Sequence, residues 1–96
     1  MYKHIVSWEF SDANKLQNIA EMKALLETLP ALIPEIEGYE VGINVSNSPL
    51  AMDMVLISSF MDENAYKIYA KHPEHAEVVN ALHSVTSNAV IVDYNL

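Results

Sequence analysis

The segment Met52-Asp53-Met54-Val55-Leu56-Ile57-Ser58-Ser59-Phe60 sets the architecture of this chain, because it is apolar at nearly every position. Successive side chains of a strand point to opposite faces. One face carries Met54, Leu56, Ser58 and Phe60, and the other carries Asp53, Val55, Ile57 and Ser59. A strand of this kind is covered on both faces. Helices of the same chain can cover one face, and a second copy of the chain is the expected cover for the other.

N-terminal to this strand, Tyr2–Phe10 alternates in polarity, which predicts a strand with one buried face. That face carries His4, Val6, Trp8 and Phe10. A helix capped by Ser11-Asp12 is expected next. Its apolar stripe, at helical spacing, consists of Leu16, Ile19, Met22, Leu26 and Leu29. Pro30 and Pro34 then predict an irregular connection over residues 29–37.

Gly38 opens a further alternating strand that reaches Val45, and the polar stretch after it predicts a turn. C-terminal to the apolar strand, Asp62 is expected to cap a helix that ends at His72. Pro73 breaks that helix and suits the first position of the next one. A last strand is expected over residues 89–94. The order of elements predicts an α+β, ferredoxin-like, four-stranded antiparallel sheet with helices on one face.

Length and composition limit the classes of function. A chain of 96 residues forms one domain, residues 1–96. Five lysines against thirteen acidic residues give a net charge of −8, so neither nucleic acid nor an anionic membrane is an expected partner. The chain has no cysteine, no apolar run long enough to cross a bilayer and no signal peptide. These features predict a cytoplasmic protein.

Several motifs spread over the whole chain belong together. They are Lys3-His4-Ile5-Val6, Ile33-Pro34-Glu35-Ile36, Val55–Phe60, Tyr69 with His72-Pro73-Glu74-His75, and Val92-Asp93-Tyr94. With them the chain resembles the stress-responsive A/B barrel (Dabb) family of dimeric α+β barrels. The resemblance implies a homodimer in which two sheets pack face to face. It also implies a cavity between sheet and helices, as in polyketide cyclases of similar architecture.

By the same resemblance, His4 and His75 take the catalytic positions, and Tyr69 a position that can orient one of them. From the residues alone, His4 is more readily explained as a core histidine bonded to a backbone carbonyl or to Asp93. His75 lies in the first turn of a helix, which disfavours the imidazolium form, whereas the adjacent Glu74 and Glu77 favour it. A surface histidine at a helix start is the plain alternative.

Trp8, Tyr69 and His72 are candidates for ligand contact. Trp8 and Tyr69 are as readily explained as core aromatics, and His72 as the residue that ends one helix and caps the next. No transition-metal site is expected, because His72 and His75 lie on either side of a proline break.

We therefore expect a cofactor-free enzyme of cyclase, isomerase or lyase type that acts on a small, partly apolar carbonyl compound through histidine acid/base chemistry. The alternative is a non-catalytic small-molecule binder or stress-associated homodimer. A haem or flavin protein is the third class, because related barrels include lactone isomerases and haem-handling monooxygenases and the scaffold does not fix a reaction.

Overall fold

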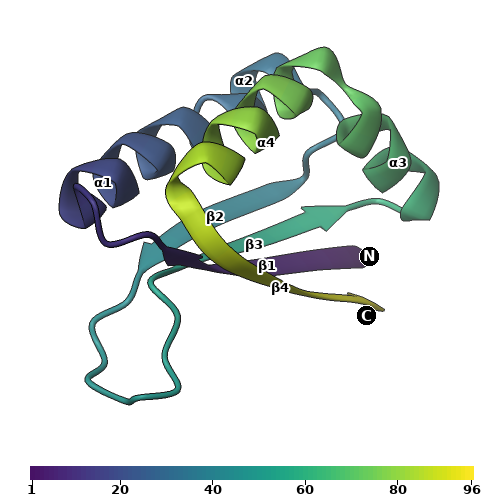
Figure 1. Cartoon of the computed structure of the whole chain (residues 1–96). Helices are drawn as coiled ribbons and strands as arrows, with labels where there is room; N and C mark the ends of the chain where they lie inside the picture. Colours follow the sequence, from purple (N-terminus) through teal and green to yellow (C-terminus); the bar gives the residue numbers. More distant parts are fainter.

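The four strands form one antiparallel sheet in the order β2-β3-β1-β4. In this computed structural model, which describes residues 1–96, they are β1 (Tyr2–Phe10), β2 (Gly38–Ile43), β3 (Met54–Phe60) and β4 (Thr86–Asn95). The helices are α1 (Lys15–Leu26), α2 (Leu29–Leu32), α3 (Glu63–Lys71) and α4 (Pro73–Val85). All four helices lie over the same face of the sheet (Figure 1). The predicted α+β ferredoxin-like fold is confirmed.

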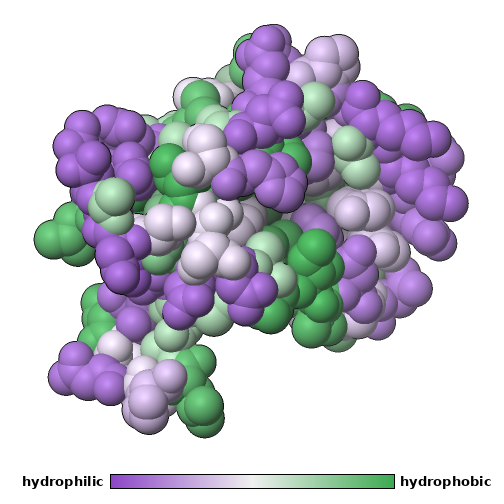
Figure 2. Space-filling model, in the orientation of Figure 1, coloured by the Kyte–Doolittle hydropathy of each residue, from purple (hydrophilic) through white to green (hydrophobic).

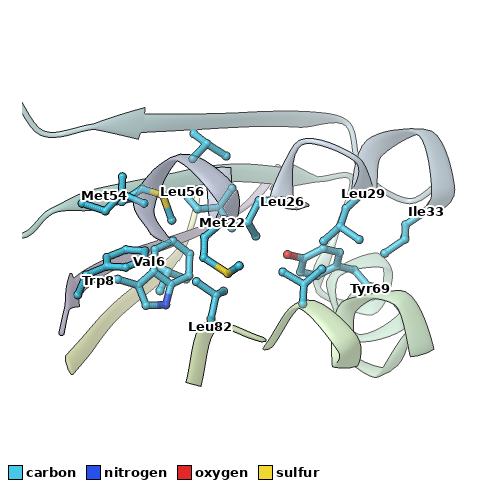
Figure 3. Close-up of a cluster of buried hydrophobic side chains, with 14 of the residues drawn as sticks. Val6, Trp8, Met22, Leu26, Leu29, Ile33, Met54, Leu56, Tyr69 and Leu82 are labelled. Carbon is cyan, nitrogen blue, oxygen red and sulfur yellow. The ribbon is translucent and has the colours of Figure 1, made fainter. Parts of the chain in front are cut away.

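The core lies between the helices and the inner face of the sheet (Figure 3). Side chains of β1 and β3 meet the buried residues Met22 and Leu26 of α1 and Leu82 of α4. The inward residues of the two central strands are all buried, namely His4, Val6, Trp8, Phe10, Met54, Leu56, Ser58 and Phe60. This inner face is the one that the alternation of the two strands predicts.

The start of the first helix differs from the expectation. Ser11 and Asp12 do not cap it, because Asn14 precedes Lys15 in a left-handed conformation (φ 55°) and turns the chain into α1. Leu16, expected in the apolar stripe, is 84% exposed in the first turn of α1, whereas Ile19, Met22 and Leu26 of the same stripe are buried. The irregular connection expected over residues 29–37 is wrong for its first four residues and confirmed for residues 33–37. Residues 29–32 form the short helix α2, since proline is tolerated in the first turn of a helix, where no amide donor is needed.

The corner between α3 and α4 agrees with the sequence. Asp62 caps α3, with its Oδ1 accepting from the amide of Ala65 at 2.8 Å. His72 ends α3 and caps α4, with its Nδ1 accepting from the amide of Glu74 at 3.1 Å. Pro73 is the first residue of α4. No residue separates the two helices other than this cap, so the corner is tight.

The outer face of the sheet is open in the single chain and partly apolar. Strand register places Val92, Ile5 and Ile57 in one row and Val90 and Val55 in a neighbouring row. Val92 is 63% exposed and Ile57 is 39% exposed. Figure 2 shows hydrophobic atoms over β4 and on the loop between β2 and β3. No helix in the structure has the length and apolar character needed to cross a membrane.

Candidate functional site

A cavity of about 480 Å³ lies between the inner face of the sheet and helices α3 and α4. Its walls come from β1, β3, α1, α3, α4 and the first half of β4. Most of the lining is hydrophobic, and none of the lining residues is Asp, Glu or Lys. His4, Trp8, Tyr69 and His75, four of the five residues singled out in the sequence, all line it. An uncharged, partly apolar molecule suits walls of this composition.

His4 is held on β1 by a carboxylate from the neighbouring strand. The register of β1 and β4 places His4 directly opposite Asp93. The His4 ring is buried, and its Nδ1 lies 2.5 Å from Asp93 Oδ1. The other carboxylate oxygen accepts from the Tyr2 hydroxyl at 2.8 Å. Because a carboxylate only accepts, Nδ1 of His4 carries the hydrogen and Nε2 of the neutral ring is an acceptor.

Tyr2 packs beside the His4–Asp93 pair. Its ring stacks on Tyr66, with ring centroids 4.9 Å apart, and Tyr66 in turn lies 4.8 Å from the His4 ring. The hydrogen bond to Asp93 raises the pKa of Tyr2 to about 12, so its hydroxyl remains a donor at neutral pH. The carboxylate of Asp93 is thus fixed on both oxygens.

His75 is the third residue of α4 and half-buried. Its Nδ1 lies 3.1 Å from the carbonyl oxygen of Ala70 in α3. A carbonyl accepts, so this nitrogen also carries the hydrogen. Burial lowers the pKa of His75, the bond to Ala70 opposes that shift, and the nearby His4 and His72 lower the pKa further. The ring is therefore a neutral base with its lone pair on Nε2.

The Nε2 atoms of His4 and His75 are both free to bond a ligand. Neither has a hydrogen-bond partner in the chain. Every fully buried side-chain nitrogen or oxygen in the structure has a partner, so neither Nε2 is fully buried. Since both residues line the cavity, a ligand bound there can reach an unpartnered nitrogen on each ring.

Tyr69 packs against both histidines but hydrogen bonds neither. Its ring centroid is 4.4 Å from that of His75 and 6.4 Å from that of His4. Its hydroxyl is bonded to the hydroxyl of Tyr39 at 2.9 Å. Burial raises the pKa of Tyr69 well above its usual range and that of Tyr39 to about 12, so both phenols stay protonated. The ring of Tyr69 can orient His75 by packing alone.

His72 lies outside the cavity, contrary to its selection for ligand contact. The physical reason is its place at the helix corner, where its Nδ1 is occupied by the amide of Glu74. His83, to which the sequence assigned no role, is exposed but lines the cavity. The sequence offered a backbone carbonyl or Asp93 as the partner of a buried His4, and the structure confirms Asp93. Strand register, which places Asp93 opposite His4, decides between the two.

The arrangement can move protons at an uncharged ligand. It offers two imidazole acceptors, one of which is backed by a carboxylate that stabilises the ring after it accepts a proton. It holds no cysteine, its one serine, Ser87, bonds Glu9 rather than a histidine, and no group of three His, Asp or Glu side chains lies close enough together to hold a metal ion. General acid/base chemistry is the class that these groups serve best.

Comparison with known proteins identifies relatives of this chain. The model of the Stress responsive A/B Barrel Domain family matches residues 2–96. An uncharacterised protein of Streptomyces coelicolor is 30% identical over 98% of both chains.

Two solved structures extend the comparison. A Bacteroides fragilis protein, described as dimeric, of unknown function and with a ferredoxin-like fold, is 33% identical with a TM-score of 0.87, over 99% of this chain and 95% of that one. The hydroxynitrile lyase of Passiflora edulis shares the fold, with a TM-score of 0.86 and 15% identity over 97% of this chain and 90% of that one.

Proposed function

Because this chain belongs to the stress-responsive A/B barrel domain family, we propose that it binds a small, uncharged, partly apolar carbonyl compound in its cavity and catalyses proton transfer on it. The observation that carries the proposal is the pair of unpartnered Nε2 atoms, on His4 and His75, in one cavity without charged walls. A family relation does not fix a reaction, so the proposal depends on this site.

The proton transfer would run between two histidines. Neutral His75 removes a proton from the carbon next to the carbonyl and becomes an imidazolium. His4, in its protonated form against the Asp93 carboxylate, donates its Nε2 hydrogen to the carbonyl oxygen, and the product is an enol. Return of the two protons to different atoms gives isomerisation, and loss of a group from the enol gives elimination. Both outcomes are consistent with the cyclase, isomerase or lyase class.

The apolar wall of the cavity would hold the rest of the ligand. Val6 and Leu56 of the sheet face Val78 and Leu82 of α4 across it. An apolar ligand stem buried there contributes about 25 cal/mol per Å² removed from water. A carboxylate or phosphate on that stem would find no Lys or Arg in the lining, so charged ligands are disfavoured.

The alternative is a binder without turnover. It is supported by the Tyr69 hydroxyl, which is engaged with Tyr39 rather than with either histidine. In that case the two imidazoles supply hydrogen bonds to the ligand and nothing more. The two functions are distinguished by turnover, not by affinity.

We further propose that the protein works as a homodimer through the outer face of its sheet. Dimers among similar solved structures support this, as do the exposed Val90, Val92 and Ile57 on that face. Sedimentation of the purified protein at micromolar concentration tests it, and a monomer would contradict it.

Phenylacetone is a suitable probe for the site, since it joins an uncharged carbonyl to an apolar ring and has exchangeable protons next to the carbonyl. Trp8 is the chain's only tryptophan and lines the cavity, so its fluorescence reports binding. Exchange of the probe's protons for deuterium, followed by proton NMR in D₂O, reports catalysis. We expect saturable quenching of Trp8 and exchange faster than in buffer.

The variant His75→Ala should reduce the exchange rate by about 10²-fold or more while binding persists. His72→Asn is the matched control, because it also removes an imidazole, keeps a side chain that caps helices, and lies outside the cavity. Exchange is compared at pH 8, where His75 is neutral in both proteins, because His72 also lowers the pKa of His75. Binding without exchange in the wild type would favour the alternative. Absence of both would contradict the proposed ligand class.

A further inference from the structure

The loop between β2 and β3, residues 44–53, projects from the molecule. It leaves the sheet on the side opposite the helices (Figure 1). Two large apolar side chains on it are almost fully exposed, Val45 at 96% and Leu50 at 91%. Val45 was expected at the end of the second strand, but β2 ends at Ile43. Side chains of this size are not left in water without a cost, so the loop presents surface suited to a partner.

The loop is ordered by its own hydrogen bonds. Near its start, Asn44 Oδ1 accepts from the amide of Ser46 at 3.0 Å, and Ser46 Oγ accepts from the amide of Ser48 at 3.0 Å. At its base, the amide of Asn44 donates to the carbonyl of Asp53 at 2.9 Å, and the Asp53 carboxylate accepts from the amide of Phe10 at 2.7 Å. An arm that is already ordered loses little entropy when it binds.

Charge indicates what kind of partner the arm fits. The chain carries a net charge of −8, so two copies repel each other over most of their surface. From Asn44 to Met52 the arm has no charged residue. Two like-charged copies can therefore approach along this segment without bringing acidic side chains together.

The arm is also continuous with the outer face of the sheet. A groove of about 290 Å³ lies where they meet. Ser7, Gly42 and Val55 of the outer face line one side, and Ala51 and Met52 of the arm line the other. A side chain of a second copy seated on the sheet face would reach this groove.

We infer that residues 44–53 form a dimerisation arm that packs Val45 and Leu50 against a second copy of the chain. The inference rests on the sheet-face homodimer proposed above. The arm adds a contact region beyond the sheet, and each subunit contributes one arm. The two-fold symmetry of a homodimer then makes every substitution in the arm count twice.

The test compares the double variant V45Q/L50Q with L16Q. Leu16 is a matched control, because it is as exposed as the arm residues and lies in α1 on the helix side of the sheet. Sedimentation over a dilution series gives the dimer dissociation constant. We expect V45Q/L50Q to raise it at least about 100-fold, and L16Q to change it less than about 3-fold.

The absence of cysteine allows a second readout. Single variants Leu50→Cys and Leu16→Cys are reacted with a thiol reagent, and each rate is divided by its rate in denaturant. At concentrations where the wild type is a dimer, Leu50→Cys should react at least about 10-fold more slowly than Leu16→Cys. On dilution to monomer the two rates should converge.

The outcomes separate the two proposals. A wild type that is monomeric at micromolar concentration overturns the dimer itself and the arm with it. A dimeric wild type whose V45Q/L50Q variant keeps its dissociation constant, with fast labelling of Leu50→Cys, overturns the arm alone. In that case the loop serves some other partner or none.

Discussion

Substituting Asp93 by Asn should weaken the hold on His4 without disturbing the fold. Asparagine keeps the shape of the side chain and can still bond Tyr2, but it loses the charge. If its oxygen stays with Tyr2, its amide group faces Nδ1 of His4, which must then be an acceptor. The hydrogen of the neutral ring moves to Nε2, so His4 no longer accepts a proton there, and the imidazolium that the proposed transfer uses loses its carboxylate partner.

The magnitude follows from burial. The His4 ring is 7% exposed and the Asp93 side chain 25% exposed. A neutral imidazole N–H bonded to a carboxylate is a hydrogen bond to a charged group, and such a bond contributes about 1.5–3 kcal/mol. Solvent around the partly exposed Asp93 lowers that contribution. We expect a coupling free energy of about 1–2 kcal/mol between His4 and Asp93 at pH 7.

A double-mutant cycle measures this coupling. His4→Phe, Asp93→Asn and the double variant are unfolded in urea at one fixed protein concentration, because dimerisation makes stability depend on concentration. Nitrogen chemical shifts of the His4 ring report which nitrogen carries the hydrogen in wild type and in Asp93→Asn. A coupling below about 0.3 kcal/mol, together with an unchanged tautomer, would refute the assignment of Asp93 as the residue that fixes His4.

Three further predictions follow from the described contacts. The folded state lowers the pKa of His75 from 6.5, so the unfolded state binds that proton more tightly. The free energy of unfolding should therefore fall as pH drops below about 6.5. His75→Gln should remove part of this fall in urea titrations at pH 7.5 and 5.5. Tyr69→Phe leaves the half-buried hydroxyl of Tyr39 without its partner and should cost about 1 kcal/mol of stability, with the tautomer of His75 unchanged by NMR. Gly38→Ala would place a Cβ 2.5 Å from Ser59 Oγ and should lower stability by about 1–3 kcal/mol, and the added substitution Ser59→Ala should recover most of it in thermal unfolding.

The parts of the fold that the sequence predicts are those with local causes. The alternation of β1 and β3, the cap at Asp62 and the break at Pro73 each depend on a few neighbouring residues, and the structure confirms them. The position of Leu16 was wrong although the rest of its stripe is buried, because helical spacing alone does not show that the first turn of α1 extends past the packed core. The sequence likewise did not predict α2, since a proline can either open a helix or prevent one.

The site divides in the same way. His4 and His75 were selected through a family resemblance, and both line one cavity. Their protonation pattern depends on Asp93 and on the carbonyl of Ala70, which reach them through strand register and helix packing. Asp93 was one of two partners that the sequence offered for His4, whereas the Ala70 carbonyl was not predicted, because it reaches His75 only through the packing of the α3–α4 corner. The sequence left two roles open for His72, as a helix cap or as a ligand contact, because its position next to Pro73 is compatible with both. The structure shows the cap.

The tight corner at His72 has a consequence for how this site can change over evolution. α4 starts at Pro73 with no spacer, so the direction of His75 is set by the same helical phase that buries Val78 and Leu82. One inserted residue would turn everything after it by about 100° around the helix axis. Selection for a packed interior should therefore also preserve the direction of the imidazole, and insertions and deletions should be absent from this corner.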